Sequence, residues 1–170
     1  MTFSIFVKTL TGKLPKYEGP VIADTYISEI DIPNQGKIPF KLLETSGNED
    51  YGPMFNCWIT DSDGFLLIFA FNDKESFQFI KNRYKQIKNL KKDKNPIIVV
   101  GNKCDLESER KIDSQEAIEY AKEIGAKYYE TSAKTDANGN CKVIFEECAR
   151  MIYSQILEKK EIKSKKCLIF

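Results

Sequence analysis

The sequence predicts an α/β fold in which helices cover both faces of an open, mostly parallel sheet. Residues 65–71 and 96–101 form two apolar runs, as expected of strands that are buried on both faces of a parallel sheet. Segments with helical spacing of apolar residues follow these runs, and such alternation of strands and helices is typical of parallel sheets. With 170 residues, the chain is long enough to bury a sizeable core in one domain.

The N-terminal part is predicted to contain a helix, a loop and a hairpin. Four apolar residues recur at the spacing of one helix face, namely Phe3, Phe6, Val7 and Leu10. An irregular loop follows over residues 16–22. Residues 25–32 and 38–44 are then expected to be extended, and turn-forming residues 33–36 lie between them. This pattern favours an antiparallel hairpin.

The C-terminal part is predicted to contain three helices and a short strand. The first helix has one apolar face, formed by Phe77, Ile80, Tyr84 and Ile87. Asp113 and Glu116 have the spacing of a capping box for the second helix. Residues 127–130 form the short strand, and residues 143–156 form the last helix.

Composition excludes several classes of function. The chain has no histidine, so imidazole catalysis and histidine-ligated metal sites are excluded. Its five cysteines are odd in number and lack C-x-x-C spacing, which argues against a disulfide framework or a zinc site. The net charge of +1 gives no reason to expect a nucleic acid as a partner. No secretory leader is recognised, so a reducing cytosol is the expected compartment.

Two polar loops follow two predicted strands. Asn102-Lys103-Cys104-Asp105 comes directly after the strand at 96–101, and Glu130-Thr131-Ser132-Ala133-Lys134 closes the next one. Ligands of open α/β sheets bind at the carboxyl ends of strands. The Asp105 carboxylate can accept both in-plane N–H donors of guanine, a bidentate contact that adenine cannot supply. The Lys103 stem can lie along the base, and a backbone N–H near Ala133 can meet the guanine carbonyl.

The sequence therefore predicts a guanine site, with two solvated loops as the alternative. The residues assigned to it are Asn102, Lys103, Asp105, Ser132, Ala133 and Lys134. The N-K-x-D and E-T-S-A-K motifs, in this order and at this separation, resemble the base-recognition loops of Ras-like small GTPases. The resemblance covers nearly the whole chain. It implies a G domain over residues 1–156, incomplete at its N-terminus, and GTP or GDP with Mg²⁺ as ligands.

The resemblance does not extend to the phosphate-binding loop. The motif G-x-x-x-x-G-K-[ST] does not occur in the sequence. Thr2-Phe3-Ser4-Ile5-Phe6 matches the start of the family's first helix, and Met1 stands where the phosphate-binding lysine belongs. The family's first, central strand is therefore expected to be missing between the strands at 38–44 and 65–71. Without it, these strands either close on each other or expose a slot, unless further residues precede the present sequence.

The resemblance also implies that magnesium binding and hydrolysis are altered. It assigns Thr2 and Glu44 to the metal, where Glu44 replaces an aspartate and Val21 stands in place of a threonine ligand. It assigns Gly47 to the γ-phosphate and Asn48 to the attacking water, which the family positions with glutamine. Because phosphoryl transfer depends on positioning and charge stabilisation, little or no GTPase activity is expected.

Partner residues are also implied by the resemblance. Those in the effector and switch segments are Asp24, Tyr26, Tyr51, Met54 and Trp58. The last three recur at i, i+3 and i+7, so they form either a patch that binds effectors and exchange factors or a face that packs on a neighbouring helix.

The C-terminal residues 157–170 are predicted to be a basic, prenylated tail. Cys167-Leu168-Ile169-Phe170 fits the C-a-a-X prenylation signal, with terminal phenylalanine favouring geranylgeranyl. Upstream lysines would supply the second signal that stable anchoring on anionic lipid needs. The expected location is the cytoplasmic face of a membrane, in particular the plasma membrane.

Two functions remain open at this point. One is a membrane-anchored GTPase switch whose first strand and phosphate loop precede the present sequence. The other is a non-catalytic interaction protein that tethers effectors or regulators at the membrane. The changes at Val21, Glu44 and Asn48 favour impaired catalysis in either case.

Overall fold

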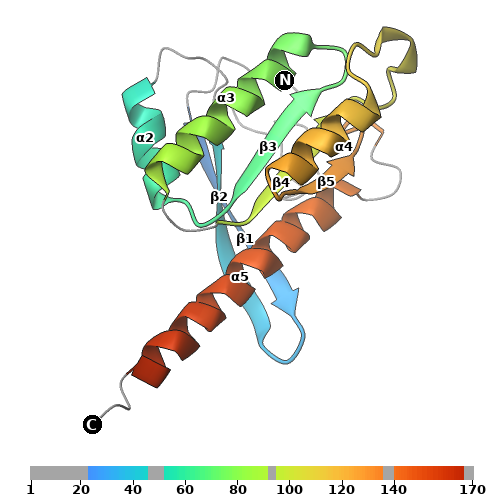
Figure 1. Ribbon diagram of the computed structural model, residues 1–170. Coiled ribbons are helices and arrows are strands. Elements are labelled where there is room, and N and C mark those ends of the chain that lie inside the picture. Colours follow the sequence, from blue (N-terminus) through green and yellow to red (C-terminus); the bar gives the residue numbers. More distant parts are fainter. Residues whose placement is uncertain (1–22, 46–51, 92–94, 136–139, 167–170) are drawn as a thin grey trace.

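The computed structural model describes residues 23–45, 52–91, 95–135 and 140–166 (Figure 1). Several predictions lie outside these ranges. They concern the helix at 3–10 and the residues Thr2, Val21, Gly47, Asn48, Tyr51 and Cys167. These stay predictions.

The predicted hairpin is confirmed. Strand β1 (Ala23–Ile32) pairs antiparallel with β2 (Gly36–Thr45), and the register places Ala23 opposite Thr45. The turn contains Asn34 and Gly36 with φ angles of 67° and 76°, a region that asparagine and glycine tolerate better than other residues. The apolar pattern and turn residues thus predicted both the pairing and its reversal point.

The predicted parallel sheet is also confirmed. Strands β3 (Phe65–Ala70), β4 (Ile97–Asn102) and β5 (Lys127–Glu130) are arranged in the order β3-β4-β5, and both pairs are parallel. Residues of β4 from Ile98 to Asn102 are all buried, which explains why this strand reads as an apolar run. Figure 1 shows the arrow of β3 ending near the loops that precede α4.

The described ranges contain four α-helices and one 3₁₀ turn. They are α2 (Gly52–Asp61), α3 (Lys74–Leu90), α4 (Ser114–Glu123) and α5 (Asn140–Lys166), with a 3₁₀ turn at Glu107–Glu109. The Asp73 carboxylate accepts hydrogen bonds from the backbone N–H groups of Glu75 and Ser76 and so caps α3.

Asp113 caps α4 as predicted, since its carboxylate accepts from the backbone N–H of Gln115 at 2.7 Å. The other half of the predicted capping box, a contact from the Glu116 side chain back to the start of the helix, is not what the structure shows. Glu116 lies 3.5 Å from the Lys81 ammonium of α3, so its side chain links two helices. The final helix α5 also continues past the predicted end at Ile156, as far as Lys166.

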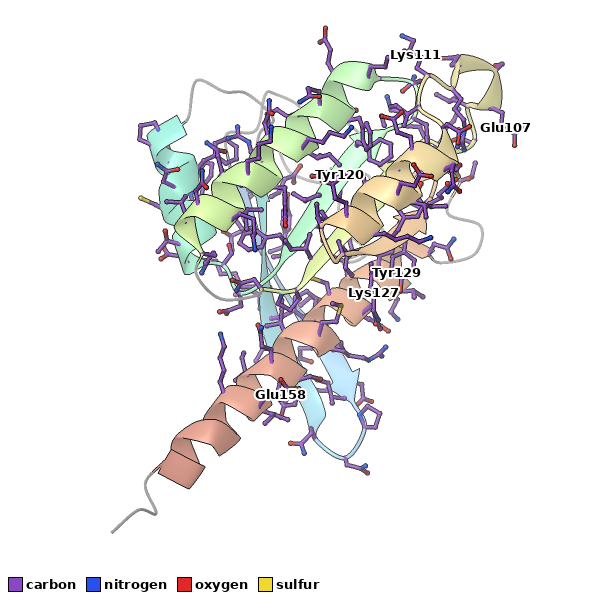
Figure 2. All side chains as sticks on the ribbon, viewed as in Figure 1. Glu107, Lys111, Tyr120, Lys127, Tyr129 and Glu158 are labelled. Atoms are coloured by element: carbon purple, nitrogen blue, oxygen red, sulfur yellow. The ribbon has the colours of Figure 1, made fainter. Side chains whose placement is uncertain are left out.

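The core has two parts, one on each face of the parallel sheet. One part joins the sheet to α2, α3 and α4 through residues that include Ile59, Leu67, Phe69, Phe77, Ile80 and Ala117. The other joins it to α5 through residues that include Ile98, Val100, Ile144, Phe145 and Cys148. Helices therefore cover both faces, as predicted. Tyr120 of α4 extends the first part, and Figure 2 shows it between α3 and α4.

The hairpin and the parallel sheet remain separate sheets. Within the described ranges, β2 pairs with β1 and β3 pairs with β4, and β2 and β3 are not paired with each other. The two strands thus do not close on each other, and the prediction that a central strand is missing stays a prediction. The hairpin turn lies beside α5 (Figure 1), where the Tyr153 hydroxyl donates to Gln35 Oε1 at 3.0 Å. Among the helices of the described ranges, none combines the length and the hydropathy that a membrane span requires.

Candidate functional site

Asn102 joins the two predicted base-recognition loops. It is the last residue of β4 and is 0% exposed. Its Oδ1 atom accepts from the backbone N–H of Lys103 at 2.7 Å and from that of Ala133 at 3.0 Å. A second link is the hydrogen bond from the Cys104 N–H to the Thr131 carbonyl, at 3.2 Å. The structure thus brings the two motifs together at one edge of the sheet.

The loop after β4 presents Lys103 and Asp105. Lys103 has a φ of 61°, a conformation that costs a non-glycine residue free energy and that often occurs at functional sites. Its ammonium lies 3.4 Å from the Asn72 side-chain oxygen. Asp105 is exposed, so its carboxylate is accessible to a ligand. Burial raises the pKa of the neighbouring Cys104 thiol, which keeps it protonated at neutral pH.

The loop after β5 is better buried. Ser132 and Ala133 are each 6% exposed, and the Ser132 hydroxyl accepts from the backbone N–H of Thr135 at 3.2 Å. Lys134 is exposed. The Ala133 N–H already donates to Asn102, so it is not free to meet a guanine carbonyl in this arrangement. A neighbouring N–H would have to meet the base.

The buried atoms of this site fit a purine ring. Asn102 Nδ2 is buried and has no hydrogen-bond partner among the described residues. A buried donor without an acceptor is costly, and a ligand that brings an acceptor removes that cost. The ring nitrogen N7 of a purine is such an acceptor. A carboxylate such as that of Asp105 can accept the pair of N–H donors that guanine has and adenine lacks.

Arg110 supports the second loop from outside the motif. Its Nη2 donates to Glu130 Oε2 at 3.3 Å and its Nη1 donates to the Ser114 hydroxyl at 2.6 Å. Its guanidinium lies 3.7 Å from the centre of the Phe71 ring. The Tyr128 hydroxyl donates to the other Glu130 oxygen at 2.8 Å. Glu130, the first residue of the second motif, is thus held from both sides.

Phe71 connects Arg110 with the first loop, because it contacts both Arg110 and Asn102. Its N–H donates to the Asn102 carbonyl at 3.0 Å, and its own carbonyl accepts from the N–H groups of Lys111 and Ile112. Neither Arg110 nor Phe71 could be assigned these roles from the sequence, because Arg110 stands in a polar loop and Phe71 has the pattern of an ordinary core residue.

Glu44 is the predicted metal residue that the structure describes, and it lies on β2 opposite Asp24 of β1, away from the hairpin turn. Glu44 is 5% exposed and accepts from the Tyr26 hydroxyl at 3.3 Å, and Asp24 accepts from the same hydroxyl at 3.0 Å. Burial, followed by these two carboxylates, raises the pKa of Tyr26 above its ordinary value. In the part of the chain that is described, no three acidic or cysteine side chains gather as metal ligands would.

Both alternatives for the predicted partner residues of α2 find support. Met54 is 46% exposed, as a binding patch requires. Trp58 is half-buried and packs edge-to-face on Phe55, with ring centres 5.1 Å apart. Phe55 in turn lies under the Arg83 guanidinium of α3, 3.6 Å from its ring centre. Trp58 therefore belongs partly to the helix contact, whereas Met54 is exposed.

Comparisons with known proteins agree with these motifs. The sequence model of the Ras family matches residues 4–154. The protein ras-1 of Neurospora crassa is 42% identical over 126 residues, which cover 74% of this chain and 58% of that protein. The Ras-related proteins ralB-B and ralB-A of Xenopus laevis are each 36% identical over 149 residues, which cover 86% of this chain and 71% of theirs.

The range matched by the family model includes both base-recognition loops, the hairpin and the parallel sheet. The match reaches less than two thirds of the Neurospora protein's length, so the activity of a whole relative does not transfer directly. Fold, motifs and matches nonetheless agree, and the chain belongs to the Ras family of small GTPases.

Proposed function

We propose that this chain is a guanine-nucleotide-binding switch of the Ras family whose base-recognition end is retained and whose phosphate and magnesium end is altered. The observation that carries the proposal is the position of Asn102. Its Oδ1 accepts hydrogen bonds from both loops, and its buried Nδ2 has no acceptor among the described residues. The same loops present Asp105 to solvent.

Each residue has a distinct task when guanine binds. The Asp105 carboxylate accepts the two in-plane N–H groups of the base, and the Lys103 stem covers its flat side. Asn102 Nδ2 donates to a ring acceptor. The backbone around Ala133 and Lys134 meets the carbonyl oxygen, after a small rearrangement that exposes an N–H. Adenine lacks the donor pair that Asp105 needs, which makes the site selective.

The phosphate end of the site is expected to bind the nucleotide's phosphates and Mg²⁺ weakly. Bound Mg²⁺ supplies charge neutralisation to the phosphates in phosphoryl transfer. Val21 has no ligand atom for it, and Glu44 is engaged with Tyr26. Asn48 is one carbon shorter than the glutamine that positions water in the family. We therefore expect weak or absent binding of GTP by these 170 residues and no measurable hydrolysis.

Replacing Asp105 by alanine should remove the preference for guanine. Charge-assisted hydrogen bonds contribute about 1.5–3 kcal/mol, so affinity for GDP should fall roughly ten- to hundredfold while affinity for ADP stays unchanged. Titration with fluorescent GDP and ADP, each with and without Mg²⁺, measures the effect.

A matched control is Glu107→Ala. It removes the same charge from a residue near the loop, and Figure 2 shows Glu107 at the outer end of this region. It should leave both affinities unchanged. Equal binding of GDP and ADP by the unaltered chain would refute base recognition, and tight binding that EDTA abolishes would refute the altered phosphate end.

A non-catalytic interaction protein is the second candidate, favoured by the exposed Met54 on α2. It would hold effectors or exchange factors without cycling between nucleotide states. Binding of an effector or exchange factor, measured in the presence of GDP and of GTP, separates the two candidates, since a switch distinguishes the two nucleotides and the interaction protein does not.

The tail is proposed to anchor the protein to the cytoplasmic face of a membrane, in particular the plasma membrane. Cys167 would carry a geranylgeranyl group, and lysines upstream would bind anionic lipid. We expect Cys167→Ser to abolish lipid incorporation and shift the protein from the membrane fraction to the soluble fraction. Replacing Lys159 and Lys160 by glutamine should weaken membrane binding without preventing lipid attachment, and unchanged fractionation of Cys167→Ser would refute the anchor.

A further inference from the structure

Arg110 contacts three parts of the fold that meet beside the base-recognition loops. Its Nη2 atom donates to Glu130 Oε2 at the end of β5, at 3.3 Å, and its Nη1 atom donates to the Ser114 hydroxyl at the start of α4, at 2.6 Å. The guanidinium also lies 3.7 Å from the centre of the ring of Phe71, which directly follows β3. One side chain therefore connects the ends of β3 and β5 with the start of α4.

The backbone next to Arg110 is fixed relative to the first base-recognition loop. The N–H groups of Lys111 and Ile112 donate to the Phe71 carbonyl at 2.8 and 3.2 Å. The Phe71 N–H donates to the Asn102 carbonyl at 3.0 Å, and Ile112 is buried. Hydrogen bonds of the main chain thus hold Arg110 near the first loop, and its side chain reaches from there to the second loop.

Glu130 is the residue through which Arg110 contacts the second loop. It is the last residue of β5 and directly precedes Thr131, whose carbonyl accepts from the Cys104 N–H of the first loop at 3.2 Å. Farther along the second loop, the Ala133 N–H donates to the first loop at 3.0 Å. The contact of Arg110 with Glu130 therefore lies beside the hydrogen bonds that join the two loops.

The ion pair between Arg110 and Glu130 is too exposed to contribute much to global stability. The two side chains are 26% and 30% exposed, and ion pairs near the surface contribute little to the free energy of unfolding. The planar guanidinium nonetheless bonds to Glu130 and Ser114 at once while it lies on an aromatic ring, a combination that lysine cannot reproduce. Such a contact fixes the geometry of the loop more than it stabilises the domain.

We propose that Arg110 is a positioning residue for guanine recognition, which fixes the second base-recognition loop relative to the first without touching the base. The inference rests on the proposed function, since the loops that Arg110 connects are those assigned to guanine. A base that contacts both loops at once binds well only when the loops are held at the right separation, and residues outside the contact shell commonly hold it. Loss of Arg110 should therefore let the second loop open more often and weaken binding of the base.

The first measurement is amide hydrogen exchange of the full chain without nucleotide. In Arg110→Ala, the Cys104 and Ala133 amides, which donate from one loop to the other, should exchange at least about tenfold faster than in the unaltered chain. Amides of α5, which covers the opposite face of the sheet, should exchange at unchanged rates. The urea midpoint should fall far less than in a variant that lacks the Phe71 ring.

Arg150→Ala is the matched control. Arg150 is an exposed arginine of α5 that pairs with Glu146 at 3.2 Å, so the variant removes a similar ion pair at a place remote from the loops. Exchange of the Cys104 and Ala133 amides should stay unchanged in it. Unchanged exchange in Arg110→Ala, or faster exchange over the whole chain including α5, would overturn the proposal.

Two further variants test whether the effect passes through Glu130. Arg110→Lys keeps the charge but cannot make all three contacts, so its exchange rates should lie between those of the unaltered chain and of Arg110→Ala. Adding Glu130→Gln to Arg110→Ala should cause no further increase, because both changes break the same contact and a glutamine oxygen can still accept from the Tyr128 hydroxyl. Additive increases would overturn the proposal.

Titration with guanosine measures the consequence for base recognition. Guanosine has no phosphate, so the altered phosphate end plays no part in its binding. Its affinity should fall by about tenfold in Arg110→Ala and stay unchanged in Arg150→Ala. Faster loop exchange with unchanged guanosine affinity would overturn the proposal. If the unaltered chain bound no guanosine, the guanine site and the role of Arg110 in recognition would both be refuted, while the exchange rates would decide separately whether Arg110 positions the loops.

Discussion

Replacing Phe71 by alanine should lower the free energy of unfolding by about 3–5 kcal/mol, which is the usual cost of deleting a buried phenyl ring. Phe71 is 0% exposed, and its ring meets Phe69 edge-to-face with centres 5.2 Å apart. The Arg110 guanidinium also loses its aromatic contact. Because whole domains are stable by only about 5–15 kcal/mol, much of the margin would disappear. Urea titration measures the change.

Two further variants test whether the loss of stability expected for Phe71→Ala arises from lost packing of the ring. Ile27→Ala removes an apolar side chain that is 78% exposed, so its effect should stay within about 0.5 kcal/mol. Gly101→Ala would place a Cβ 2.6 Å from ring atoms of Phe71 and should cost about 1–3 kcal/mol by overpacking. In the Phe71→Ala background this cost should fall, since the two residues are in contact. If Gly101→Ala lowered stability equally in the unaltered chain and in the Phe71→Ala variant, the contact between these two residues would be contradicted.

Local signals in the sequence predicted most of the individual elements. Turn residues between two extended segments predicted the β1–β2 hairpin, because Asn34 and Gly36 accept positive φ angles. Apolar runs predicted β3 and β4, because both strands lie between two helical layers. The N-K-x-D and E-T-S-A-K motifs predicted where polar loops would meet, since parallel strands end at the same edge.

Contacts between distant segments could not be predicted in the same way. The spacing of apolar residues shows which face of α3 is buried, but it does not show which residues of other helices that face contacts. Glu116 was expected to complete the capping box of α4, and instead its side chain pairs with Lys81 of α3. Arg110 supports Glu130 through a contact that has no local pattern. The last helix was predicted too short because its apolar face ends near Ile156, although the Lys- and Glu-rich residues beyond it also favour helix.

The second large effect is expected at Asn102, where stability and base recognition depend on the same side chain. Asn102→Leu leaves the part-buried N–H of Lys103 and the buried N–H of Ala133 without their acceptor. An unsatisfied buried group costs about 1–3 kcal/mol, so two of them should lower the free energy of unfolding by roughly 2–6 kcal/mol. Discrimination between GDP and ADP should disappear as well, because the two loops are no longer held together.

Asn72→Ala is the matched control, since it removes a contact of the Lys103 ammonium at the surface without touching the backbone bridge. It should cost little stability and retain the preference for guanine. Urea titration and fluorescent-nucleotide titration on both variants separate the two roles of Asn102. A stable Asn102→Leu variant would contradict the bridge, because Oδ1 would then not be needed to hold the loops. A destabilised variant that still prefers GDP would show that guanine is read without the arrangement that Asn102 maintains.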